Sequence, residues 1–106
     1  MIADIEDRDF DRIIAAADVP VLVEFWQPGC GACQGLLRTL EQVEAIAGPR
    51  LRIYKMNVQE NHQIPAELDI SSLPALALYR GGEFERFIGG LARPDLLLAQ
   101  LPLAPR

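Results

Sequence analysis

The sequence predicts an α/β fold, a central mixed β-sheet flanked by helices, in a single domain spanning residues 1–106. The chain has 106 residues, of which 50% are apolar. This is enough to bury a core without disulfides or a structural metal, and too short for two domains. Apolar runs typical of strands alternate with stretches of helical periodicity, which favours parallel strands joined by helical crossovers. Gly81 and Gly82 join the last two strand-like runs and predict an antiparallel hairpin.

In the first half of the chain the pattern predicts a helix, a strand and a longer helix. Residues 7–17 place apolar side chains on one face and acids on the other, as an amphipathic helix does. Residues 19–26 are a nearly continuous apolar run, typical of a strand covered on both faces, and Glu24 is the acid within it. After turn residues at 27–29, apolar side chains recur at helical spacing over 36–47.

The second half of the chain supplies the remaining elements. The glycine and proline at 48 and 49 end the long helix. Proline 94 suits the first turn of a final helix. The predicted elements are strands at 50–58, 75–80 and 83–88, a weak helix at 61–68 broken around Pro65, and a last helix at 94–101.

The formal net charge of −5 excludes two classes of partner. Binding to nucleic acid or to an anionic membrane needs a cluster of lysine and arginine, and the chain has none. The acids concentrate in residues 1–24, which we interpret as a solvated helix face. No apolar run approaches the roughly 20 residues of a membrane span, and the start at Met1 lacks the pattern of a secretory signal. The sequence therefore predicts a cytoplasmic protein.

Cys30-Gly31-Ala32-Cys33 lies where the buried strand passes into the long helix. Cysteines three residues apart in a first helical turn share a face and can form a disulfide. The N–H groups and the dipole at the helix start favour the Cys30 thiolate, which makes Cys30 the nucleophile and the more buried Cys33 the resolving thiol. The alternatives are half of a zinc site or an incidental pair. His62 is the one good nitrogen ligand, which disfavours zinc, and no metal site is predicted.

Three further residues have alternative interpretations. Pro74 opens an apolar strand, either as an ordinary strand-start proline or with a cis peptide bond. If Glu24 faces inward, desolvation raises its pKa; if its strand is an edge, the carboxylate reaches water. Lys55 is the only lysine, and taken by itself it is interpreted as a surface residue near a strand end.

Together these residues resemble the thioredoxin family over nearly the whole chain. The resemblance implies the thioredoxin fold and thiol–disulfide exchange, with Cys30 attacking and Cys33 resolving. It also implies a cis bond at Pro74, a catalytic acid at Glu24 in place of the family's buried aspartate, and Lys55 near that acid. The matching stretches are Val23-Glu24-Phe25-Trp26, Cys30-Gly31-Ala32-Cys33, Tyr54-Lys55-Met56-Asn57-Val58, Ile70 to Leu78, and Gly81-Gly82-Glu83 with Gly89.

Several residues near the cysteines depart from the family pattern. Gly29 replaces a tryptophan, Ala32 a proline, Gln34 a lysine and Ala75 a threonine. These changes leave the nucleophilic chemistry in place and alter the surface that meets the substrate. The resemblance implies supporting roles for Trp26 and Lys55, and substrate contacts at Gly29, Gly31, Ala32, Leu73, Pro74 and Gly89.

The function expected from the sequence is a cytosolic, monomeric reductase of protein disulfides with no bound cofactor. The resemblance implies that NADPH supplies electrons through a thioredoxin reductase. The alternative is a thioredoxin-fold interaction module that holds a specific partner and has little reductase activity. A disulfide-forming oxidant is a third possibility, which the absence of a signal sequence disfavours.

Overall fold

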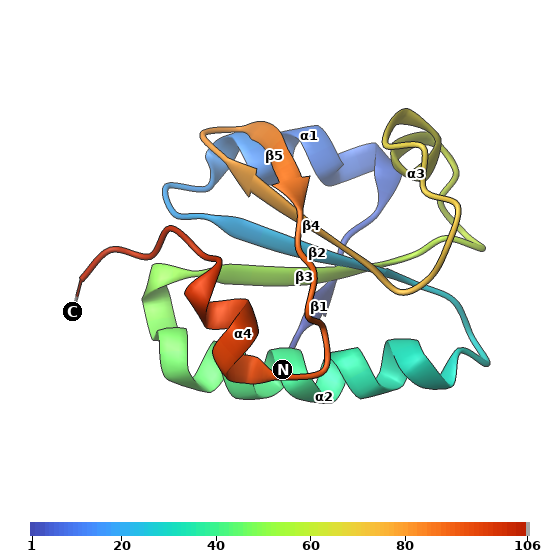
Figure 1. Cartoon of the computed structure of the whole chain (residues 1–106). Helices are drawn as coiled ribbons and strands as arrows, with labels where there is room; N and C mark the ends of the chain where they lie inside the picture. The colour runs from blue at the N-terminus through green and yellow to red at the C-terminus, as the bar shows by residue number, and fades with distance from the viewer. Residues whose placement is uncertain (106) are drawn as a thin grey trace.

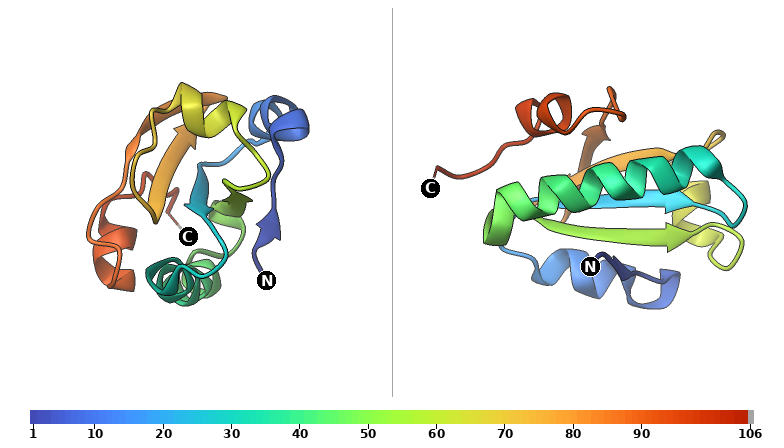
Figure 2. Two further views of the ribbon diagram at one scale, coloured as in Figure 1. Left: turned by 90° about the vertical axis from the view of Figure 1, so that its right-hand side faces the viewer. Right: turned by 90° about the horizontal axis from the view of Figure 1, so that it is seen from below.

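The computed structural model describes residues 1–105 and contains a five-stranded mixed sheet between two layers of helices (Figure 1). Helices α1 and α3 cover one face of the sheet and α2 and α4 the other, as Figure 1 and the left view of Figure 2 show. The elements in chain order are β1 (Ala3–Asp4), α1 (Asp7–Ala16), β2 (Val21–Trp26), α2 (Gly31–Ala47), the 3₁₀ helix η1 (Gly48–Arg50), β3 (Arg52–Asn57), α3 (Gln63–Glu67), β4 (Ala75–Arg80), β5 (Glu83–Phe87) and α4 (Pro94–Ala99).

The strand order is β1-β3-β2-β4-β5, with β2 at the centre. Strands β1, β3 and β2 are parallel, and β4 runs antiparallel to both β2 and β5. The predicted arrangement, early strands parallel and the last pair an antiparallel hairpin, is confirmed. Residues Val21 to Phe25 are all buried, which confirms a strand covered on both faces.

Each face of the sheet has its own apolar core. Leu51 and Ile53 of the β3 region pack with α2 and α4, while Tyr54, Met56 and Val58 pack with α1 and α3, as their alternation predicts. Since a strand residue faces one layer or the other, β3 contributes to both cores.

The structure corrects several of the expected elements. Strand β1 was not predicted. The predicted strand at 50–58 is shorter, because residues 48–50 form η1. Helix α3 runs through Pro65 instead of breaking there, because the first turn of a helix does not need that N–H. The last helix ends at Ala99 rather than at 101.

This topology brings the ends of β2 and β3 and the start of α2 to one edge of the sheet (Figure 1). The loop before β4 lines a groove with Cys30 at the same edge. Within residues 1–105 no helix combines the length and apolarity required to span a membrane.

Candidate active site

A tight turn connects β2 to α2. The Cys30 N–H donates to the Gln27 carbonyl at 3.3 Å, with Pro28 and Gly29 at the two central positions. Gly29 has φ +83°, and a Cβ there would meet nothing within 4 Å. Proline followed by a residue with positive φ is the pattern of a type II turn, in which glycine is favoured. The residue at position 29 is therefore constrained by the backbone and not by crowding.

Cys30 and Cys33 form a disulfide at the start of α2, with their Cα atoms 5.2 Å apart. Cys30 is the N-cap residue, and its Sγ accepts a hydrogen bond from the Cys33 N–H at 3.1 Å. Cys30 is half-buried, whereas Cys33 is only 2% exposed. The expected pairing and the expected difference in burial are both confirmed. On reduction, the helix N-terminus would stabilise negative charge on the Cys30 sulfur.

The peptide bond between Leu73 and Pro74 is cis, which decides between the two interpretations of Pro74. Strand β4 begins at the next residue, Ala75. A surface groove of about 440 Å³, which we call the Cys30 groove, runs between Cys30 and this loop. It is lined by Gln27, Cys30, Val58, Pro65, Ile70, Ser71, Ser72 and Leu73.

Glu24 lies on the central strand β2 and is 1% exposed. The edge-strand alternative is therefore wrong. Within residues 1–105, neither carboxyl oxygen has a hydrogen-bond partner. Burial raises the Glu24 pKa to about 8, against the opposing charge of Lys55. A carboxyl group in this state is mostly protonated at pH 7 and can exchange a proton with a thiol of similar pKa.

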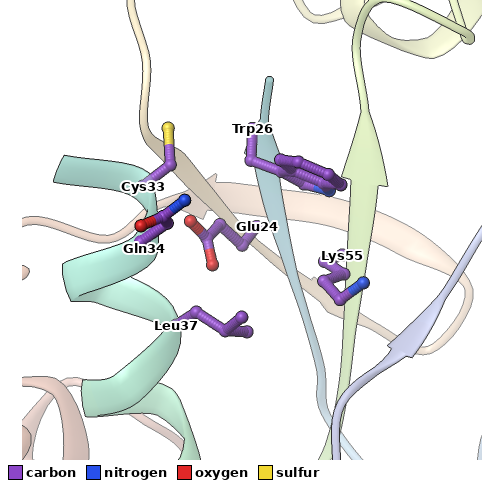
Figure 3. A pocket seen from close by; sticks show the side chains of 6 residues that line it. All are labelled: Glu24, Trp26, Cys33, Gln34, Leu37 and Lys55. Carbon is purple, nitrogen blue, oxygen red and sulfur yellow. The ribbon is translucent and has the colours of Figure 1, made fainter. Parts of the chain in front are cut away.

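A pocket of about 180 Å³ lies beside Glu24, and we call it the Glu24 cavity. Figure 3 shows the Glu24 carboxyl group directed toward α2, beside the Cys33 and Gln34 side chains. The Nε1 atom of Trp26 is also buried and has no hydrogen-bond partner in the part of the chain that the structure describes. The cavity is lined by Glu24, Trp26, Cys33, Gln34, Leu37 and Lys55. The predicted acid and the predicted resolving cysteine therefore line the same pocket.

Lys55 is opposite Glu24 in the register of β3 and β2, but its ammonium group is bound elsewhere. Its Nζ lies 2.5 Å from Asp4 Oδ1 and 5.3 Å from the centre of the Trp26 ring. Its side chain is 22% exposed, so Lys55 lies partly at the surface and is paired there with Asp4. Asp4 was not predicted from the sequence to be a site residue. It becomes recognisable only once β1 pairs with β3, because that register places Asp4 beside Lys55.

The remaining predicted contact residues fall into two places. Gly29, Gly31 and Ala32 are exposed around Cys30, so the rim beside the disulfide consists of small side chains. Gly89 follows β5, and its carbonyl accepts a hydrogen bond from Gln100 Nε2 at 2.7 Å. Gly89 does not line the Cys30 groove. Among residues 1–105 no cluster of three or more His, Cys, Asp or Glu side chains could hold a metal ion.

Comparison with known proteins gives a consistent result. The chain matches the family model described as Thioredoxin over residues 1–101. It is 34% identical over 79 residues to Thioredoxin of Haemophilus influenzae, covering 74% of each chain. It is 33% identical over 98 residues to Thioredoxin of Rickettsia felis (92% of this chain, 93% of the relative). Thioredoxin 1 of a Nostoc species is 32% identical over 98 residues, with 92% and 91% covered. With its Cys30–Cys33 pair at the start of α2, the chain belongs to the thioredoxin family and is a protein thiol–disulfide oxidoreductase.

Proposed function

We propose that this protein reduces disulfides of other proteins, with Cys30 as nucleophile, Cys33 as resolving thiol and Glu24 as proton acceptor. The observation that supports this assignment most directly is the unequal environment of the two sulfurs. Cys30 lines an open groove, whereas Cys33 is 2% exposed and lines the Glu24 cavity. A substrate can approach the first cysteine, and a buried base can serve the second.

In the first step the Cys30 thiolate attacks one sulfur of the substrate disulfide. The substrate S–S bond breaks, a Cys30–substrate mixed disulfide forms, and the other substrate sulfur leaves as a thiolate that takes a proton from water. The Cys30 groove gives the substrate chain a place beside Leu73 and Pro74, where backbone groups can hydrogen-bond to it.

In the second step Cys33 attacks the Cys30 sulfur. In the fraction of molecules in which Glu24 has already lost its proton to water, the Cys33 proton passes to the Glu24 carboxylate. The mixed disulfide breaks, and the second substrate sulfur leaves as a thiolate that takes a proton from water. The substrate has gained two electrons and two protons, and Cys30 and Cys33 are again a disulfide. A Glu24 pKa near 8 is close to the roughly 8.5 of a free thiol, so this proton transfer is nearly balanced in energy.

We further propose that the protein works as a monomer in the cytoplasm and is re-reduced by NADPH through a thioredoxin reductase. Membership of the thioredoxin family supports this assignment of the electron donor. The small rim at Gly29, Gly31 and Ala32 is the surface that such a reductase would have to recognise.

An insulin-reduction assay tests the reductase against the interaction module. Turnover above the dithiothreitol background supports the proposed reaction, and turnover equal to that background contradicts it. A Cys33→Ser variant should trap the substrate on Cys30, whereas a Cys30→Ser variant should trap none. Substrate captured on Cys33 instead would reverse the assigned order.

The role of Glu24 is tested by separating the two steps in a single turnover. We expect Glu24→Gln to slow attack by Cys33 by about a hundredfold, the scale of general-base catalysis, and to leave attack by Cys30 nearly unchanged. The matched control is Glu41→Gln, because Glu41 is an exposed residue of α2. Equal slowing of both steps by Glu24→Gln would contradict the role of proton acceptor.

A further inference from the structure

Two exposed phenylalanine rings lie side by side on β5. This strand is one of the two edge strands of the sheet (Figure 1). Phe84 is 39% exposed and Phe87 45%. Residues three apart in a regular strand point to opposite faces, but an irregularity in the β4–β5 pairing shifts the register between them. Their ring centres are consequently 5.1 Å apart, with an edge-to-face angle of 62°.

Buried aromatic side chains support the exposed pair of rings. The Phe84 ring contacts Tyr79, which is 6% exposed, at a centroid distance of 5.7 Å. Tyr79 in turn contacts the buried Phe10 of α1 at 5.2 Å. These contacts order the exposed rings before any partner binds, which lowers the entropic cost of using them in recognition.

Phe87 also borders a surface hollow of about 270 Å³ on the far side of the loop that carries Pro74. We call it the Phe87 hollow. Its apolar wall includes Ile70, Pro74, Phe87 and Leu91. The hollow shares Ile70, Ser71 and Ser72 with the Cys30 groove. One continuous surface therefore leads from Cys30, across residues 70–72, to Phe87.

We propose that the Phe87 hollow is a specificity subsite that takes a large apolar side chain of the substrate polypeptide, away from its reacting cysteine. The inference rests on the proposed reaction, in which the substrate is covalently attached to Cys30 and must therefore lie on the adjoining surface. An extended segment that follows this surface reaches Ile70 first and the ring of Phe87 next. Apolar surface that the segment buries in the hollow is removed from water when the mixed disulfide forms. This burial strengthens the attachment of an apolar substrate relative to a polar one.

The test uses disulfide-linked peptides that share one cysteine in a serine- and glycine-rich chain. A phenylalanine is placed at each other position in turn, and thiol release by excess reduced protein is followed in a single turnover. At one or two positions we expect phenylalanine to raise the second-order rate constant about fivefold over the serine peptide, as partial burial of one ring allows. Phe87→Ser should bring this ratio close to one, and Phe87→Leu should retain most of it.

The matched control is Ile46→Ser, which removes a side chain that is 46% exposed near the opposite end of α2. It should keep the fivefold ratio. Each ratio is taken within one variant, so a loss of folded protein lowers both rates alike and leaves the ratio unchanged. Equal rates for all peptides with the natural protein, or a fivefold ratio that survives Phe87→Ser, would overturn the subsite and leave the proposed reaction standing. Failure to reduce any peptide would overturn the reaction and the subsite with it.

Discussion

Replacement of the buried Glu24 by glutamine should change how the stability of the oxidised protein depends on pH. The Glu24 pKa rises from 4.5 to about 8 on burial. Below pH 4.5 the carboxyl group is protonated in the folded and unfolded states alike. Between 4.5 and 8 it is protonated only in the folded state, so the folded state binds one more proton and the free energy of unfolding falls as pH rises. Above 8 the group is ionised in both states and the loss is complete.

The size of this effect follows from the change in pKa. Each unit corresponds to about 1.4 kcal/mol, so the full rise amounts to about 5 kcal/mol, and about 4 kcal/mol of it falls between pH 5 and pH 8. This is a large share of the 5–15 kcal/mol, roughly, that stabilises an ordinary domain. Glutamine is neutral throughout, so Glu24→Gln should match the natural protein near pH 5 and exceed its stability at pH 9.

Urea unfolding of both oxidised proteins, followed by far-ultraviolet circular dichroism from pH 5 to pH 9, measures the difference directly. In the oxidised form the two cysteines do not titrate, which removes them from the comparison. Burial raises the Tyr79 pKa to about 12, which places that group outside the range. Glu41→Gln, on an exposed position of α2, should follow the natural protein at every pH. Parallel curves for Glu24→Gln and the natural protein would refute the raised pKa.

Three further predictions concern residues around the site. Ala32→Pro removes an N–H group from the start of α2 that can stabilise a reduced Cys30 thiolate. Glutathione titration should therefore show the natural protein to be about 30 mV less reducing than the variant. An equal or lower potential for the natural protein would contradict this reasoning. Gly29→Ala should lower the free energy of unfolding by about 1 kcal/mol because φ is +83° there, whereas Gly31→Ala, in α2, should not; urea titrations that show equal effects would exclude the backbone explanation. Asp4→Asn should leave the Lys55 ammonium group free to act on Glu24 and should lower the Glu24 pKa by about one unit. The pKa is followed through the carboxyl carbon resonance of Glu24. An unchanged or raised Glu24 pKa would contradict the role given to the Asp4–Lys55 pair.

The sequence was most informative where short-range patterns determine structure. The apolar run around Glu24 predicted a covered strand, and the Cys30–Cys33 spacing predicted a disulfide in a first helical turn. The cis bond at Pro74 was open on local grounds and was favoured only by the family resemblance. Local patterns were sufficient for the buried strand and for the helix start because both depend on neighbouring residues.

Features that depend on long-range pairing could not be predicted in the same way. Strand β1 has two residues, too few for any periodicity, and it exists because β3 pairs with it between the buried Ile2 and Ile5. The Asp4–Lys55 contact follows from that pairing. Likewise, simple alternation along β5 would separate its two phenylalanines, and only the irregular pairing with β4 places their rings together.

The same long-range pairing determines the electrostatics of the buried acid. Lys55 lies opposite Glu24 in the sheet register, where its ammonium could have formed an ion pair and lowered the Glu24 pKa. Asp4 on the far side of β3 binds that ammonium instead, at 2.5 Å, and Trp26 lies against it. Desolvation outweighs the lysine charge, so the carboxyl group is mostly protonated at pH 7. A neutral carboxyl is far less costly to bury without hydrogen bonds than a carboxylate, which is how Glu24 can lie unpartnered beside Cys33. Burial thus keeps the Glu24 pKa in the range where the carboxyl group can exchange a proton with a thiol.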